Sequence, residues 1–266
     1  MFGKYRIDED AKVDLKDYDP GEDGKLDKDG MEEEVAKNLG ALDELQFKLY
    51  AEGKQSLLIV LQAMDAGGKD GTIRKVFGDL NPQGVRVTSF KAPTSDELSR
   101  DFLWRIHAHT PAKGMIGIFN RSHYEDVLIV RVNKWIDKNE CERRYRQIND
   151  FERMLTEHGT AILKFYLHIS KDEQKKRFQE RLDDPERQWK FCKGDLDTRK
   201  QWDDYMLQFG DVFRNTSTKR APWYVVPANN KRYRNLVIST IVREALEEMD
   251  PKFPMPEEGL ENIRIE

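Results

Sequence analysis

Residues 63–72 read AMDAGGKDGT and directly follow an apolar run that is typical of a β-strand. A strand, a glycine-rich turn with a lysine and then a helix form a phosphate-binding arrangement, because backbone N–H groups, the helix dipole and the lysine all face the anion. The match to the standard motif is imperfect, since Ala63 stands where the first glycine belongs and Asp70 where Ser or Thr would hold magnesium. In preference to an ordinary strand-to-helix turn, we predict phosphate binding through Gly67, Gly68, Lys69, Gly71, Thr72 and Lys75.

An acidic residue in the same turn, Asp65, suggests a metal ion. A carboxylate that faces phosphate repels it unless a cation lies between the two groups. Magnesium prefers carboxylate and phosphate oxygens, so Asp65 is a candidate Mg²⁺ ligand. The alternative is that Asp65 only caps the turn of the following helix.

A second polar cluster, NRSHYED at residues 120–126, follows another apolar run. We predict that Arg121 neutralises charge on a transferred phosphoryl group. Asp126 is expected to share the metal with Asp65 or to accept the proton of an incoming oxygen. Glu125 could do part of this work.

The same segment taken alone also fits an ordinary helix start, in which Ser122 is the cap and acidic residues occupy the first turn. Its pairing with the glycine-rich loop favours the catalytic interpretation. Asn120 and Glu125 are then the candidates for the nucleotide side of the site. His123 is expected to be a surface side chain, although it lies beside the acidic residues and could touch substrate.

The third candidate region is the basic stretch 171–200, where Arg177 and Arg181 are four residues apart and share one helix face. Together with Lys190, they are predicted to belong to a mobile helical lid that closes over phosphates and excludes water. The alternative is an exposed, salt-bridged helical hairpin. The two loops described above favour the lid.

These groups need a scaffold that brings strand ends together. Short apolar runs alternate with helical stretches, which predicts βαβ crossovers and a parallel sheet covered on both faces. Ligands bind such sheets at the carboxyl ends of the strands, where both loops lie. The predicted strands are 56–62, 85–90, 115–119, 161–169 and 223–226. The predicted helices are 31–50, 69–77, 94–108, 122–135, 140–158, 171–182, 196–214 and 232–249.

We predict one phosphotransferase domain over residues 31–250, because no repeat or linker interrupts the alternation. Residues 1–30 are polar and are expected to form an extended arm that can wrap on the domain. Residues 251–266 are an acidic tail. The arm and the end of the chain are acidic, and the middle, residues 41–243, holds 36 basic and 28 acidic side chains. This surplus suits an anionic partner, although the charge balance taken alone favours a solvated surface with acidic ends.

Composition excludes several other classes of protein. Of 266 residues, only Cys141 and Cys192 are cysteines, which excludes a disulfide scaffold and a cysteine-rich zinc site. The longest aliphatic run, 57–61, is too short to cross a membrane, and the first residues lack the apolar stretch of a secretory signal. We therefore expect a cytoplasmic protein without a membrane partner. The net charge of −4 argues against nucleic acid as the main partner.

The motifs AMDAGGKDGT, NPQGVRVTSFKAPT, GIFNRSHYEDV, KFYLHISKDEQKKRFQERL and APWYVVPA resemble those of the polyphosphate kinase 2 family from about residue 31 to residue 250. The form FNRSHYEDV resembles the subgroup that accepts both nucleoside mono- and diphosphates. The resemblance implies a three-layer α/β/α fold like that of thymidylate kinase, a P-loop kinase with a helical lid. It also implies magnesium-dependent, reversible phosphoryl transfer between inorganic polyphosphate and AMP or ADP, and a homo-oligomer, either a dimer or a tetramer.

By this resemblance Asp65 and Asp126 would hold Mg²⁺, Lys69 and Arg121 would act on the phosphates, and lid residues would line a polyphosphate channel. Two other functions stay open. An ATP-dependent nucleoside monophosphate kinase would share the loop and the lid, but the presence of Asp65 in that loop and the wide basic surface argue against it. A non-catalytic polyanion-binding protein would place Asp65 and Asp126 next to an anion without a metal ion to offset their charge, which argues against it.

Overall fold

The computed structural model describes residues 2–265, apart from the side chain of Glu261. Within them one five-stranded sheet has the order β2-β3-β1-β4-β5, and all neighbouring strands are parallel. The predicted parallel sheet is therefore confirmed, with each strand within one residue of its expected bounds. The strands are β1 (Ser56–Gln62), β2 (Val85–Ser89), β3 (Ile116–Asn120), β4 (Thr160–His168) and β5 (Trp223–Pro227).

Strand β1 lies at the centre of the sheet and is buried along its whole length. Its pairing with β3 aligns Leu61 with Asn120. The segment that follows β1 and the segment that follows β3 therefore leave the same edge of the sheet as immediate neighbours. This register brings the two loops singled out in the sequence side by side.

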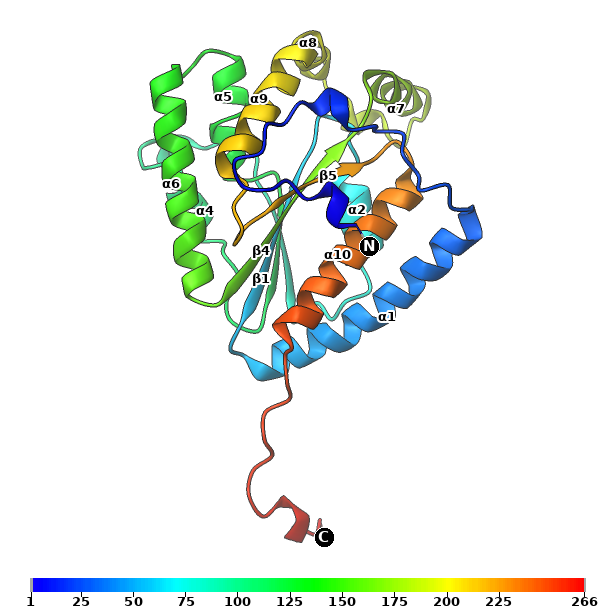
Figure 1. Cartoon of the computed structure of the whole chain (residues 1–266), viewed down its shortest axis with the longest axis vertical. Helices are drawn as coiled ribbons and strands as arrows, with labels where there is room; N and C mark the ends of the chain where they lie inside the picture. The colour runs from blue at the N-terminus through cyan, green and yellow to red at the C-terminus, as the bar shows by residue number, and fades with distance from the viewer. Residues whose placement is uncertain (1, 266) are drawn as a thin grey trace.

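Helices cover both faces of the sheet (Figure 1), so the expected three-layer α/β/α arrangement is confirmed. One layer holds α1, α2 and α10, and α1 and α10 pack along one another. The other layer contains α5, α6 and α9. Their bounds are α1 (Lys28–Glu52), α2 (Lys69–Val76), α5 (Ile129–Val132), α6 (Lys138–Glu157), α9 (Trp202–Thr216) and α10 (Lys231–Met249).

Three predicted helices are broken in the structure. The stretch 94–108 forms two short helices, because Thr94 caps the first with a capping box and Asp101 accepts the N–H of Leu103 ahead of the second. Apolar periodicity alone does not reveal such internal start signals. The resulting pieces are α3 (Ser95–Leu98), α4 (Trp104–His107), η3 (His123–Asp126) with α5, and α8 (Gly194–Lys200) with α9.

The N-terminal residues pack against the outer edge strand of the sheet. Phe2, Tyr5, Ile7 and Leu15 are buried in the same core as the strands, and the Ile7 N–H donates to the Trp223 carbonyl at 2.8 Å. These residues are therefore part of the domain's core rather than an appendage. Helix α1 begins at Lys28, inside the range expected for the arm.

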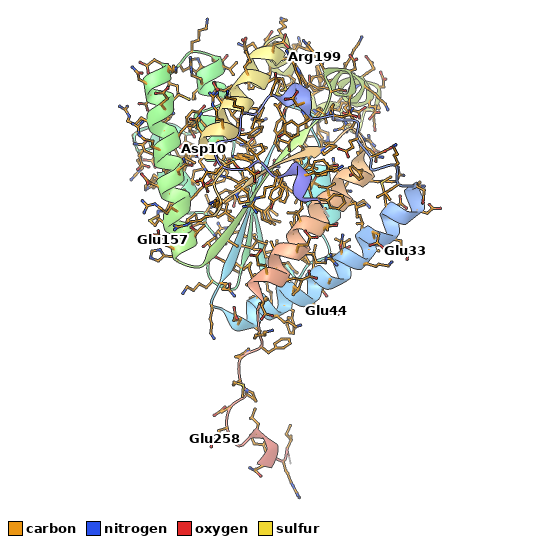
Figure 2. The ribbon with its side chains drawn as sticks, viewed as in Figure 1. Asp10, Glu33, Glu44, Glu157, Arg199 and Glu258 are labelled. Atoms are coloured by element: carbon orange, nitrogen blue, oxygen red, sulfur yellow. The ribbon has the colours of Figure 1, made fainter. Side chains whose placement is uncertain are left out.

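The C-terminal residues beyond α10 extend away from the body of the molecule (Figure 1). Phe253 packs its ring against Phe47 of α1 at 5.6 Å, and Glu258 lies on the extended part (Figure 2). Glu33 and Glu44 on α1 are exposed to solvent. In residues 2–265, no helix combines the length and the apolar character needed to cross a membrane.

Candidate active site

The turn between β1 and α2 requires glycine at two consecutive positions. A Cβ on Gly67 would overlap the side chain of Ala63, and the Gly67 N–H closes the turn by donating to the Met64 carbonyl at 2.9 Å. Gly68 has φ +104°, and a Cβ there would overlap the guanidinium of Arg234. The turn delivers the chain to the first residue of α2, whose free N–H groups and dipole favour an anion.

The other predicted phosphate-binding residues around this turn differ in what they contact. The Lys69 ammonium donates to the Ala63 carbonyl at 3.2 Å, and burial together with Arg121 lowers the pKa of Lys69. The Thr72 hydroxyl is committed to the Gly68 carbonyl at 3.2 Å. Lys75 is exposed and lies six residues beyond Lys69, about 9 Å along the helix. The structure therefore does not bring Lys75 to the loop, because its helix carries it away.

Arg121 connects the end of β3 to the glycine-rich loop. Its backbone adopts φ +62°, which is uncommon for a residue with a side chain. Its guanidinium contacts Asp65 at 3.0 Å and Glu125 at 3.8 Å. Burial acts against the charge of Arg121, but Glu125 and Asp65 hold its pKa above the ordinary value. The structure thus gathers one guanidinium and two carboxylates beside the glycine-rich loop, as strand order β3-β1 requires.

Asp126 lies in a different environment from the one expected. Its carboxylate lies 3.9 Å from the Arg144 guanidinium, and burial raises its pKa to about 6 against the effect of Arg144 and Arg105. The carboxylate that faces Asp65 across Arg121 is Glu125, not Asp126. That Asp126 shares a metal with Asp65 stays a prediction, although the 3₁₀ turn η3 directs the consecutive side chains of Glu125 and Asp126 to different sides.

Asp126 instead contributes to the wall of a cavity of about 730 Å³ between the α3–α4 segment and α6. Aromatic, cationic and acidic groups line it: the Arg144 guanidinium lies over the Phe102 ring at 5.1 Å and pairs with Glu140 at 2.8 Å. Sequence reasoning missed Arg105 and Arg144, because arginines on polar helix faces resemble solvated ones. The volume is that of a small-molecule site.

Asp70, which stands where the standard motif has Ser or Thr, connects three elements. Its carboxylate accepts from the Asn120 amide at 2.9 Å and pairs with the Lys190 ammonium at 3.5 Å. Asn120 thus ties the end of β3 to α2. Lys190, within η4 (Gln188–Lys190), thereby connects the predicted lid to the start of α2.

Arg177 on α7 (Lys171–Asp183) has a role that the sequence did not indicate. It is only 5% exposed, and its guanidinium donates to the carbonyls of Ala66 at 3.0 Å and Ala228 at 2.6 Å. It also pairs with Glu173 at 2.7 Å. The prediction that Arg177 lines an open channel is corrected, because these contacts make it a support of the loop from behind. Arg199 (Figure 2) ties α8 back to Lys171 at the start of α7.

Arg181 differs from Arg177 although both lie on α7. Its guanidinium donates to the Lys190 carbonyl at 3.1 Å and lies 3.9 Å from Asp195, and its side chain is 23% exposed. Arg181 and Lys190 therefore belong to the accessible part of the lid.

We expect Arg177→Met to lower the free energy of unfolding by about 3 kcal/mol, because it leaves buried carbonyls unsatisfied. Arg181→Met, on the same helix, should cost less than about 1 kcal/mol because its contacts are partly solvated. Urea denaturation measures both. Equal losses in the two variants would contradict the supporting role of Arg177.

Arg234 near the start of α10 was also missed. It is 2% exposed, its guanidinium fills the space beside Gly68, and it donates to the Asn235 side chain at 2.8 Å. Burial and the nearby Arg177 lower the pKa of Arg234 to about 9. A sequence signal existed, since basic residues in the first turn oppose the usual charge preference of a helix start. The two buried guanidiniums make the region behind the loop strongly positive.

His123 is buried, which corrects the expectation of a surface histidine. Its Nε2 lies 3.2 Å from the Glu152 carboxylate, and burial lowers its pKa. The side chain faces the interior because η3 packs onto α6.

Comparison with known proteins agrees with this geometry. The family model described as polyphosphate kinase 2 matches residues 25–254, which include both loops and the lid. The chain belongs to the polyphosphate kinase 2 family. A protein of Meiothermus ruber named AMP/ADP-polyphosphate phosphotransferase is 53% identical, and the alignment covers 99% of each chain.

Two further members of the family also align with nearly the whole of this chain. An ADP-polyphosphate phosphotransferase of Rhodopseudomonas palustris is 42% identical over 94% of this chain and 91% of its own. The crystal structure of polyphosphate kinase 2 from Arthrobacter aurescens TC1 superposes with a TM-score of 0.94 at 46% identity, covering 97% of this chain and 93% of that one. The resemblance in the sequence is therefore confirmed.

Proposed function

We propose that this chain transfers a phosphoryl group from inorganic polyphosphate to AMP and to ADP, giving ADP and ATP. The observation that carries the proposal is the Arg121 guanidinium, held between Asp65 and Glu125 beside a glycine-rich loop at the carboxyl edge of a parallel sheet. The full-length similarity to a relative named for AMP and ADP supports both acceptors.

The chemistry needs positioning and neutralisation of charge more than a strong nucleophile. Donor and product both contain phosphoanhydride bonds, so the free-energy change of the transfer is small and the reaction is reversible. Lys69 and Arg121 would offset the charge that develops on the transferred group. The α2 N-terminus would bind the donor phosphates, and Arg177 and Arg234 would add positive potential from behind the loop.

We propose that the acceptor nucleotide occupies the cavity lined by Asp126. Its volume of about 730 Å³ suits a nucleotide, and Phe102 offers an aromatic face. Arg105 and Arg144 would meet the acceptor phosphates. Glu125 is next to Asp126 in the chain and lies 3.8 Å from Arg121, so the acceptor would meet the donor beside Glu125 and Arg121.

Magnesium fits the residues present, as an ion shared with substrate. In residues 2–265 no three His, Cys, Asp or Glu side chains are gathered to hold a metal. Magnesium in phosphoryl transfer is usually held by one or two carboxylates and by phosphate oxygens, which Asp65 and Glu125 would satisfy. Bound there, it would neutralise phosphate charge, and Asp126 stays a candidate from the cavity side.

The direct test is an incubation with AMP, long-chain polyphosphate and Mg²⁺ but no ATP, followed by chromatography of nucleotides. We expect ADP first and then ATP, and no product when EDTA is added. ADP formation that requires ATP would favour a nucleoside monophosphate kinase. Polyphosphate binding without any turnover would favour a non-catalytic polyanion-binding protein.

The accessible part of the lid predicts a dependence on donor length. Arg181→Ala combined with Lys190→Ala should raise KM for long polyphosphate more than for short chains, because a short donor reaches fewer cations. The KM for AMP should change little, and high salt should weaken the parent's preference for long chains. Lys175→Ala with Lys176→Ala, two exposed lysines of α7, is the matched control. A parent KM that does not vary with chain length would contradict the channel.

We also propose that the chain works as a homo-oligomer, a dimer or a tetramer, in the cytoplasm. Sedimentation equilibrium of the purified chain measures the first point. A monomer at the concentration of the activity assay would contradict it.

A further inference from the structure

A buried polar cluster lies directly behind the loop that carries Arg121. It consists of four side chains that are each at most 2% exposed: His123, Tyr124, Glu152 and Lys164. We call it the anchor cluster. Its members come from η3, α6 and β4, so it joins the active-site loop to the sheet and to one helix layer.

The hydrogen bonds of the anchor cluster centre on Lys164 and Glu152. The Lys164 ammonium donates to the Tyr124 hydroxyl at 2.9 Å, to Glu152 Oε2 at 2.6 Å and to the Thr216 carbonyl at 2.7 Å. All three of its N–H groups are thereby used. Glu152 Oε1 accepts from the Tyr124 hydroxyl at 2.7 Å and lies 3.2 Å from His123 Nε2.

The charges of the cluster balance. Burial opposes ionisation of Glu152, but Lys164 and His123 hold its pKa below the ordinary value, so the carboxylate is charged. Burial keeps His123 neutral by lowering its pKa. Burial lowers the pKa of Lys164 against the effect of Glu152, but its three donated hydrogen bonds fit the ammonium form. The Tyr124 hydroxyl donates to Glu152 and accepts from Lys164.

Such a cluster is a costly way to fill a core. A buried ion pair is often no more stabilising than apolar side chains of the same volume. What it provides is a geometric constraint, because the ammonium of Lys164, both oxygens of Glu152 and the Tyr124 hydroxyl all have partners, and few arrangements of the chain allow this. The loop in front of it needs such a constraint, since Arg121 has φ +62° and unusual backbone conformations persist only where the surroundings impose them.

We propose that Tyr124 is a positioning residue for the phosphoryl transfer. Through its hydroxyl, the Glu152–Lys164 pair holds residues 120–126 in the conformation in which Arg121 and Glu125 face the transferred phosphoryl group. The inference rests on the proposed function for the roles of Arg121 and Glu125. The anchoring itself rests only on the contacts of the buried side chains.

The test is Tyr124→Phe, which removes one hydroxyl and keeps the ring that packs on Trp223 at 4.7 Å. We expect kcat to fall by ~10–100-fold, as small misplacements of catalytic groups do, with KM for AMP and polyphosphate within about twofold of the parent. Hydrogen exchange measured by mass spectrometry should become faster over residues 120–128. Tyr166→Phe is the matched control, because Tyr166 is fully buried and, among residues 2–265, the hydrogen bond of its hydroxyl is to the Met206 sulfur at 3.7 Å.

A second variant tests whether a general loss of stability, rather than lost positioning, explains a lower kcat. Glu152→Gln combined with Lys164→Met removes both buried charges together, so no unpaired charge is left to unfold the chain. It should show the same kinetic signature, with kcat lowered and KM retained, because the Tyr124 hydroxyl loses its donor Lys164 and is left with a neutral amide as acceptor. The urea midpoint of each variant is measured as well, so that a fall in kcat can be compared with any loss of stability.

The inference is overturned if Tyr124→Phe and Tyr166→Phe have equal kcat, or if exchange over residues 120–128 does not change. It is also overturned if Arg121→Lys is impaired while Tyr124→Phe is fully active. If exchange becomes faster but Arg121→Lys and Tyr124→Phe are both fully active, the assignment of Arg121 in the proposed function fails as well.

Discussion

Asp65→Asn is expected to lower turnover by ~2–4 orders of magnitude, which is the scale of losing a group that stabilises transition-state charge. Asp65 lies in the phosphate loop, 3.0 Å from Arg121, where a negative group is unfavourable next to phosphate unless a cation offsets it. The amide keeps the size and the hydrogen bond but cannot bind Mg²⁺ as a carboxylate does. Initial rates of ADP formation over a range of Mg²⁺ concentrations measure the effect.

The controls for this variant also identify the second carboxylate. Glu125→Gln should raise the Mg²⁺ concentration needed for half-maximal rate, because Glu125 faces Asp65 across Arg121. Asp126→Asn should act mainly on KM for the nucleotide, because Asp126 lines the cavity. Asp197→Asn, on the exposed surface of α8, should have no effect. Full activity of Asp65→Asn with an unchanged melting profile would remove Asp65 from the catalytic set.

Arg121→Lys is expected to reduce kcat by ~10²–10³-fold while KM for polyphosphate changes little. Lysine retains the charge but lacks the planar fork that contacts Asp65 and Glu125 at the same time. It therefore loses orientation rather than attraction for the anion. Steady-state kinetics with long-chain polyphosphate and AMP separates the two parameters.

Arg187→Lys is the matched control for that prediction, because Arg187 is exposed in the predicted lid and its ion pair within the described part of the chain is with Asp184 at 2.9 Å. It should keep the parent's kcat. If Arg121→Lys is as active as the parent, the bidentate role is wrong, and Arg121 only adds to the general positive field of the site.

Much of the scaffold could be predicted from the sequence. The run 56–62 is β1 to the residue, because a strand buried on both faces is continuously apolar and ends where polar residues begin. The glycine-rich turn after it was also predictable from local sequence, because consecutive glycines allow backbone conformations that other residues rarely adopt. Gly68 has a positive φ. The neighbouring placement of the loops after β1 and β3 followed from the rule on strand ends, although the strand order itself came from the structure.

Tertiary structure decided what each polar side chain of the candidate site contacts. Arg177 and Arg181 share a helix and a residue type, yet one supports Ala66 from behind the loop and the other faces the lid's accessible side. Asp126 and Glu125 are adjacent in sequence, yet η3 separates them into two environments.

The physical reason is that burial of a long polar side chain depends on partners far away along the chain. Arg234 reaches Gly68, and His123 reaches Glu152, only because helices from other parts of the sequence pack there. Local periodicity reports where apolar side chains must be hidden from water, so strands and helices can be predicted from it. It carries no information on which carbonyl or carboxylate will satisfy a guanidinium or an imidazole, and in this protein those partners determine which charged residues can reach the phosphates.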